Sequence, residues 1–143
     1  EEHWPRYFGM IRDRLISGGS AALQIITIEE SRFDTYRKSA DFIQRYIFPG
    51  GMLPSVEALK QQFDNAKLQM ADADMFGPSY AQTLKLWRDR FLGRWSSIQP
   101  LGFDERFRRM WEMYLSYCEG GFRERVIGTV QLTFAKPGYR FAQ

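Results

Sequence analysis

The sequence predicts an α/β fold in which helices pack against a sheet. Segments with strand spacing alternate along the chain with segments of helical spacing, in the order helix, strand, helices, strand, helices, strand. With 143 residues the chain has the size of one domain. A hydrophobic share of 44% and an aromatic share of 16% are typical of a packed core built from large rings.

The first helix begins near the start of the chain, where apolar residues recur every three or four positions. These residues are Trp4, Tyr7, Phe8, Ile11 and Leu15. We expect Gly18 and Gly19 to end the helix, because glycine favours helix termination. The chain opens on Glu1, without an initiator methionine and within this amphipathic pattern. We therefore interpret it as a piece of a longer protein.

Three segments have the patterns of strands. Residues 21–28, "AALQIITI", form a nearly uninterrupted apolar run, which predicts a strand buried on both faces as in a parallel sheet. Residues 68–76 indicate a second strand. Residues 126–134 alternate with a period of two, which predicts a third strand that ends at Pro137 and Gly138.

Four further helices follow from spacing and end signals. Residues 41–48 have the spacing of a short helix, broken by "PGG", and Ser55 is a suitable N-cap for a helix over 56–65. Two long helices are expected, over 80–97 and over 104–120. Asp104 would cap the second, and Gly120 and Gly121 would stop it. Residues 29–40 are polar and mixed, and no element is predicted there.

Several kinds of chemistry find no support in the sequence. His3 is the single histidine and Cys118 the single cysteine, so there is no spacing typical of a metal site or a nucleophilic triad. We expect His3 to be solvated and Cys118 to be a small buried hydrophobe. One cysteine excludes an intramolecular disulfide and fits a reducing compartment. Glycine-rich phosphate loops and apolar runs of the ~18 residues that a membrane span needs are also absent.

The charge pattern leaves the partner open. The net charge is +3, and arginines at 88, 90, 94, 106, 108, 109, 123 and 125 alternate with acidic residues. Such a pattern is typical of solvated helix faces, and it is also compatible with a surface for phosphate headgroups. Nucleic acid, anionic lipid or no polyanion at all remain compatible with this charge.

Three features are candidates for a site. Gln24 is a polar amide inside the first strand, which is either satisfied in the core or aimed at a site beyond the strand. Tyr80 follows a possible N-cap, Ser79, so its hydroxyl lies at a helix start that could hold a small anion, although packing is the alternative. The stretch "YIFPGGMLPS", residues 46–55, combines turn residues with apolar ones and no charge. It is either a corner or a wall for an apolar ligand.

Three segments, "DFIQRYIFPGGMLPS", "FGPSYAQTLKLWRDRF" and "LGFDERFRRMWEMYLSYCEGGFR", resemble in this order the C-terminal half of cyclopropane-fatty-acyl-phospholipid synthases and mycolic acid cyclopropane synthases. The resemblance covers about residues 1–134. It implies a Rossmann-like S-adenosylmethionine-dependent methyltransferase fold with a seven-stranded, mostly parallel sheet. Residues 1–143 would form the C-terminal portion of a single catalytic domain, with the last strands and the inserted helices over the lipid site. The cofactor-binding half would lie upstream, so this piece alone is expected to be inactive.

The resemblance also implies roles for particular residues. Tyr80 would hydrogen-bond an active-site bicarbonate, and the backbone of Ile26 would face the same ion. Gln24 stands where the family has a bicarbonate-binding histidine, a departure that puts ring closure in question. The acyl chain would run in a channel lined by Phe48, Leu53, Leu84 and Tyr114. The S-adenosylmethionine site would lie mostly outside these residues, and no metal is implied.

The implied reaction transfers a methylene group from S-adenosylmethionine to the double bond of an unsaturated fatty acyl chain and forms a cyclopropane ring. The alkene attacks the sulfonium methyl group, and a base then removes a proton from the resulting cation. The implied partner is a phospholipid at the inner membrane surface of the cytoplasm, not nucleic acid, and an exposed strand edge would allow homo-oligomers.

Two alternatives stay open. The first is a relative that adds a methyl group to a lipid or an amine without closing a ring. An acidic residue in the channel would favour the amine. The second is a non-catalytic module that kept only the lipid site.

Overall fold

The computed structural model describes residues 1–139, which form an α/β arrangement around a three-stranded sheet. The strands are β1 (Ser20–Ile28), β2 (Gln69–Met75) and β3 (Ile127–Ala135), in the order β1-β3-β2. The central strand β3 runs antiparallel to both neighbours, and its register with β1 extends from Ser20 opposite Ala135 to Ile28 opposite Ile127. The sheet therefore brings segments more than a hundred residues apart side by side.

The first strand differs from its prediction. Along β1 the side chains alternate: Leu23 and Ile25 are partly buried, whereas Ala22 and Gln24 are exposed. The prediction that this strand is buried on both faces, as in a parallel sheet, was wrong for the described residues. β1 is an edge strand with an antiparallel partner on one side, and helices cover only one of its faces.

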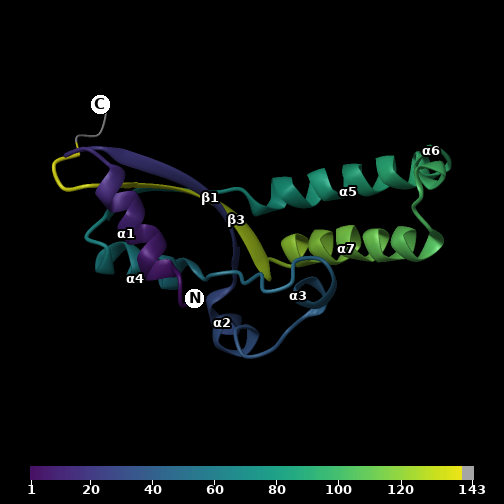
Figure 1. Cartoon of the computed structure of the whole chain (residues 1–143), viewed down its shortest axis with the longest axis horizontal. Helices are drawn as coiled ribbons and strands as arrows, with labels where there is room; N and C mark the ends of the chain where they lie inside the picture. Colours follow the sequence, from purple (N-terminus) through teal and green to yellow (C-terminus); the bar gives the residue numbers. More distant parts are fainter. Residues whose placement is uncertain (140–143) are drawn as a thin grey trace.

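One face of the sheet is closed by α1 (Trp4–Arg14) and α4 (Val56–Asn65), which lie side by side in Figure 1. The rings of Phe8, Phe63 and Phe134 meet there, with Phe63 stacked on Phe134 at 4.7 Å between centroids. Ser55 caps α4 as predicted, because its hydroxyl accepts a hydrogen bond from the Ala58 N–H at 3.1 Å.

Figure 1 shows a helical hairpin that extends away from the sheet. It consists of α5 (Gly77–Gly93) and α7 (Glu105–Arg123), joined by α6 (Trp95–Ile98) and the 3-10 helix η1 (Gln99–Leu101). The carboxylate of Asp104 accepts a hydrogen bond from the Phe107 N–H at 2.8 Å, which confirms Asp104 as the N-cap of α7. Ala81, Leu84, Leu115 and Phe122 form the buried seam between the two long helices.

Three predicted helix ends were wrong. α5 begins at Gly77 with Phe76 in the N-cap position, so Ser79 lies inside the helix and does not cap it. α7 continues through Gly120 and Gly121 to Arg123, because neither glycine takes the positive φ that ends a helix. α1 stops at Arg14, before the predicted glycines 18 and 19.

A buried carboxylate ties the hairpin together. Glu119 on α7 is 6% exposed, and its Oε1 accepts hydrogen bonds from Arg123 at 2.9 and 2.7 Å. Its Oε2 lies 2.6 Å from Nη1 of Arg88 on α5 and forms an ion pair across the hairpin. Two cations therefore neutralise the buried charge, which makes removal of either one costly.

Two short helices precede α4. The polar segment for which no element was predicted contains α2 (Glu30–Tyr36), and α3 (Phe42–Tyr46) lies within the predicted range 41–48. Asp41 and Gln44 form a capping box at the start of α3, in which the side chain of each accepts a hydrogen bond from the backbone N–H of the other, both at 2.9 Å. This fixes Asp41 beside the hairpin, where it becomes part of the site described next.

Candidate substrate site

A cavity of about 660 Å³ lies between four parts of the chain: the end of β1, residues 36–53, the second half of α7 and the start of β3. A volume of this size is typical of small-molecule sites. Its apolar lining includes Ile26, Ile28, Ile43, Phe48, Met52 and Leu53. The cavity is thus suited to an apolar ligand.

The loop after α3 contributes the cavity wall that the sequence pattern pointed to. Gly50 has φ of 79°, and a Cβ on Gly51 would stand 2.9 Å from the carbonyl oxygen of Phe48, so the bend requires glycine. The side-chain amide of Gln44 donates a hydrogen bond to the Gly51 carbonyl at 3.0 Å, which holds the loop. Phe48 and Leu53 on either side of the bend both line the cavity.

The opposite wall is the second half of α7. Tyr114 faces the loop, with its ring in an edge contact to Phe48 at 6.2 Å between centroids. Burial raises the pKa of Tyr114 and that of Cys118, which reaches about 11. Cys118 is partly rather than fully buried: it packs against the apolar seam between α5 and α7 and also lines the cavity. Gly120 and Gly121 leave space in this wall because they carry no side chain.

One end of the cavity is polar. The hydroxyl of Tyr117 lies 3.3 Å from Oδ2 of Asp41, and the Tyr36 hydroxyl accepts a hydrogen bond from the Leu53 N–H at 3.4 Å. Burial is the main cause that raises the pKa of Tyr36 and of Tyr117, and the charge of Asp41 adds to both shifts. We call the group of Tyr36, Asp41 and Tyr117 the Asp41 end of the cavity.

Sequence reasoning did not identify the Asp41 end. The capping-box spacing of Asp41 and Gln44 was visible in the sequence, and so was the spacing of Tyr114, Tyr117 and Cys118 on one side of a helix. Nothing in the sequence indicated that Asp41 and Tyr117, 76 positions apart, would meet.

Tyr80 lies in the first turn of α5, next to the cavity but not among its lining residues. Its ring packs on Phe122 at 5.2 Å and on Phe76 at 6.2 Å. Phe122 in turn lines the cavity, and Tyr80 contributes to the raised pKa of Tyr114. No hydrogen bond of the Tyr80 hydroxyl is found within residues 1–139. The predicted role of Tyr80 in binding an anion stays a prediction.

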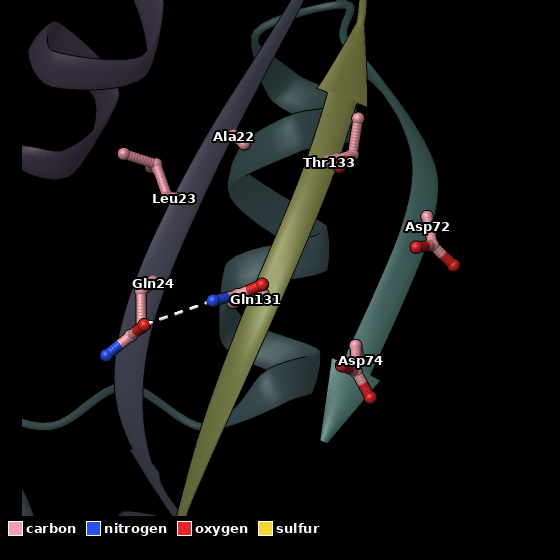
Figure 2. A pocket seen from close by; sticks show the side chains of 7 residues that line it. All are labelled: Ala22, Leu23, Gln24, Asp72, Asp74, Gln131 and Thr133. Carbon is pink, nitrogen blue, oxygen red and sulfur yellow. Dashed lines mark hydrogen bonds between the residues drawn. The ribbon is translucent and has the colours of Figure 1, made fainter. Parts of the chain in front are cut away.

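Gln24 and Ile26 project from the same face of β1 but have different surroundings. Ile26 lines the cavity. Gln24 lies in a shallower hollow of about 350 Å³ on the open face of the sheet, where its Oε1 accepts a hydrogen bond from Nε2 of Gln131 at 3.2 Å (Figure 2). The same figure shows Asp72 and Asp74 on the neighbouring strand β2. The three residues predicted for the anion therefore do not line one pocket.

Leu84, predicted for the acyl channel, is 3% exposed in the seam between α5 and α7 and does not line the cavity. Ile26, Phe48, Leu53 and Tyr114 do line it. Contact of these residues with an acyl chain stays a prediction. Within residues 1–139 no group of acidic, histidine or cysteine side chains is arranged to hold a metal ion, and no helix is long and apolar enough to cross a membrane.

Several known proteins are similar to this chain in sequence and in fold. The family model described as mycolic acid cyclopropane synthetase matches residues 1–132. Tuberculostearic acid methyltransferase UfaA1 of Mycobacterium tuberculosis is 43% identical over 136 residues, which are 94% of this chain and 32% of that protein. The cyclopropane-fatty-acyl-phospholipid synthase of Escherichia coli K12 is 33% identical over 94% of this chain and 34% of its own length.

Among solved structures, mycolic acid cyclopropane synthase CmaA1 complexed with SAH and CTAB superposes with a TM-score of 0.84 at 25% identity. The superposition covers 95% of this chain and 50% of CmaA1. Cyclopropane synthase MmaA2 from Mycobacterium tuberculosis gives a TM-score of 0.83 at 24% identity, which supports the fold alone. The chain thus spans about a third of the length of these curated relatives and half of the length of these structures. The predicted resemblance to cyclopropane synthases and the predicted methyltransferase fold are confirmed.

Proposed function

The chain belongs to the mycolic acid cyclopropane synthetase family, and from this premise we propose that it is the C-terminal portion of the catalytic domain of a lipid-modifying, S-adenosylmethionine-dependent methyltransferase. The observation that carries the proposal is the apolar cavity between the loop 47–53 and α7. The proposed substrate is a lipid with an unsaturated fatty acyl chain, whose double bond accepts the one-carbon unit. The proposed place of action is the cytoplasmic surface of the inner membrane.

The walls of the cavity support this chemistry. A reaction at an alkene that passes through a cation requires a site with little water and no strong nucleophile near the reacting carbons. Phe48, Leu53 and Ile26 supply apolar surface, and Tyr114 adds an aromatic ring to the lining, a group whose face can attract positive charge. The one thiol that lines the cavity, Cys118, stays protonated at neutral pH because its pKa is about 11, so it is a poor nucleophile there.

Bicarbonate is the proposed base. When bound, this ion supplies a mild base for removal of a proton from the substrate. The side-chain N–H groups of Gln24 are available to an anion, because its Oε1 already accepts the hydrogen bond from Gln131. The Tyr80 hydroxyl supplies a second donor. Both groups can donate to an anion, but they do not line one pocket: Gln24 lies in the hollow that also contains Asp72 and Asp74, whereas Ile26 lines the cavity.

S-adenosylmethionine, the proposed source of the methyl group, would be held mainly by residues outside this chain. The described residues 1–139 contain no glycine-rich turn between a strand and a helix of the kind that holds such a cofactor. Among residues 1–139, β1 and β2 each have an edge without a partner strand, and such an edge supports this division of the domain. An unpaired strand edge is a place where further strands of a sheet can attach. Without them, the same edge would favour self-association.

The product is either a cyclopropane ring or a methyl or methylene branch on an alkene, because the cation formed by methyl transfer loses a proton either with ring closure or with formation of a double bond. We propose the ring, which the family description names. Two observations favour the methyl branch: Gln24 replaces the histidine expected at that position, and the 43% identical relative is named a methyltransferase. An amide is not a proton carrier, so proton removal at this site would rest on the bound ion alone.

Lipid analysis of cells that express the full-length protein tests this proposal. We expect acyl chains that gain one carbon at a former double bond. Proton NMR then separates the products, because a cyclopropane methylene resonates at unusually high field, whereas a methylene branch shows alkene protons and takes up hydrogen on mild catalytic reduction. Acyl chains of unchanged mass, with the protein present and folded, would refute the proposed activity.

Replacement of Tyr80 by Phe in the full-length protein tests the anion site. Because one hydroxyl is lost and the ring remains packed on Phe122, we expect turnover to fall about tenfold or more while stability changes by less than about 1 kcal/mol. Steady-state kinetics at several bicarbonate concentrations, with thermal unfolding as the control, measure both. Unchanged turnover with the same bicarbonate dependence would remove Tyr80 from the site.

A non-catalytic lipid-binding module is the remaining alternative. The upstream reading frame distinguishes this module from the enzyme, since an acidic residue and a glycine-rich turn there support the methyltransferase. An unrelated upstream domain would contradict the methyltransferase proposal.

A further inference from the structure

The cavity has an uneven charge. Two acidic residues, Asp41 and Glu124, line it, whereas none of the described lining residues is lysine, arginine or histidine. A phosphate or a free carboxylate inside this cavity would therefore meet like charges and find no cationic partner. An apolar cavity with an uncompensated carboxylate favours a ligand whose polar part is neutral or positive.

Asp41 is the better placed of the two carboxylates. Its Oδ1 accepts the hydrogen bond from the backbone of Gln44 that caps α3, whereas its Oδ2 faces Tyr117 across the cavity end. No arginine, lysine or histidine lies within ion-pair distance of Asp41 among residues 1–139. The negative charge of Asp41 contributes to the raised pKa of Tyr36, of Tyr117 and of Cys118.

The Asp41 end lies next to solvent. The side chains of Tyr117 and Phe48 line the cavity and are also 44% and 56% exposed. A lipid whose acyl chain occupies the apolar part of the cavity would place its polar group at such an opening. Tyr117, whose hydroxyl lies 3.3 Å from the carboxylate, is in edge contact with Phe42 at 6.2 Å. A carboxylate near aromatic rings is an arrangement that favours ammonium groups.

We infer that the Asp41 end of the cavity binds an ammonium group, so that the preferred substrate is an acyl lipid with an amine in its headgroup. This inference rests on the proposed lipid-methyltransferase function and deepens it by naming the class of headgroup. It excludes free fatty acids and purely anionic phospholipids as the best substrates. An acidic residue in the channel was expected to favour methylation of an amine. In this inference Asp41 instead binds the amine of the headgroup, and the acyl double bond remains the site of methyl transfer.

A capping role alone would also account for Asp41, and one substitution separates the two roles. Asparagine is as good an N-cap as aspartate, because its Oδ1 can still accept the hydrogen bond from the Gln44 N–H. The amide nitrogen that replaces Oδ2 can donate to the Tyr117 hydroxyl, so D41N keeps the cap and a polar contact while it removes the charge. The matched control is D64N, which removes a negative charge from an exposed position at the end of α4, outside the cavity lining.

The experiment uses the full-length protein with S-adenosylmethionine and mixed micelles of lipids that carry identical unsaturated acyl chains. The headgroups are phosphoethanolamine, phosphoglycerol and none, the last as free fatty acid. With transfer to the acyl chain as the readout, we expect kcat/KM to be at least about tenfold higher for the amine lipid, mainly through KM, and transfer to the amine itself would count against the inference. The preference for the amine lipid should fall about five- to tenfold in D41N, as for loss of one charge-assisted contact. D64N should keep it.

A binding measurement supports the kinetics without turnover. Hexadecyltrimethylammonium and hexadecyl sulfate carry the same chain with opposite charge, and calorimetry below their micelle concentrations compares their affinities. We expect the ammonium compound to bind more tightly and D41N to remove most of the difference.

Equal use of the three lipids, or the same headgroup preference in D41N and the unchanged protein, would overturn the inference while leaving the methyltransferase proposal intact. A cooperative unfolding transition with an unchanged midpoint shows that D41N is folded. Should D41N fail to fold, Tyr117→Phe provides a second comparison, because it removes the hydroxyl at the Asp41 end and keeps the ring. We expect a smaller loss of headgroup preference in this variant, and an unaltered preference would count against the inference. Absence of methyl transfer to every lipid would refute the proposed function instead.

Discussion

Two regions of the molecule are built from aromatic side chains and differ in what they enclose. Where α1 and α4 cover the sheet, Phe8, Phe63 and Phe134 pack within 4.7 to 6.3 Å of one another and are almost completely buried. Where α7 faces the loop 47–53, Phe48 and Tyr114 meet at 6.2 Å beside a cavity of about 660 Å³. Aromatic residues thus fill a packed core in one region and line a cavity in the other. We call these the closed region and the open region.

The difference arises from what accompanies the rings. In the closed region the partners are aliphatic side chains on regular helices and strands, which interdigitate to high density. In the open region the partners include tyrosine hydroxyls, two helix glycines and a glycine-containing bend, none of which fills space between the walls. Aromatic content alone therefore does not tell a core from a binding site.

The largest expected effect is on the closed region. Phe63→Ala should lower the free energy of unfolding by about 3–5 kcal/mol, because a stacked ring that is 1% exposed is removed and leaves a void. Phe48→Ala should cost less than about 1 kcal/mol, since more than half of that side chain is already in solvent. Urea unfolding followed by tryptophan fluorescence measures both, and equal losses would contradict the contrast between the two regions.

A pair of neighbouring glycines in α7 tests how closely the open region is packed. Gly120→Ala should raise stability by about 0.5–1 kcal/mol, because alanine favours the helix and its Cβ would meet nothing within 4 Å. In Gly121→Ala the same gain is offset, since the new Cβ would stand 3.0 Å from Cγ1 of Ile127. Thermal unfolding should therefore show a larger gain in stability for Gly120→Ala than for Gly121→Ala. Equal stabilisation would show that β3 yields at this point.

A third contrast concerns pH and Cys118 in the cavity wall. Burial raises its pKa from 9.0 to about 11, so the unfolded thiol loses its proton at lower pH than the folded one. The contribution of Cys118 to stability is complete below pH 9 and is lost as the pH rises from 9 towards 11. We expect Cys118→Ala to lose less stability across this window than the unchanged protein, as measured by urea unfolding at each pH. Parallel curves would contradict the raised pKa.

Much of the architecture followed from local chemistry. The order of helices and strands, the caps at Ser55 and Asp104 and the bend at Gly50 all rest on residues close in sequence, where spacing and backbone preference decide. The bend alone left a corner or an apolar wall open, and the family resemblance implied that Phe48 and Leu53 share one channel. End signals were less reliable, because α7 continues through two glycines that leave space for Ile127 rather than ending the helix.

The sequence by itself determined the α/β order, the apolar bend and the lack of metal-site and nucleophilic motifs, because these depend on residue type and short-range spacing. Only the tertiary structure decided that β3 inserts between β1 and β2, that Leu84 is core while Tyr114 is cavity wall, and that Asp41 meets Tyr117. Such pairings join residues far apart in the chain. An apolar strand or helix face becomes core or cavity wall according to the segment that packs opposite it, and no local sequence pattern specifies that segment.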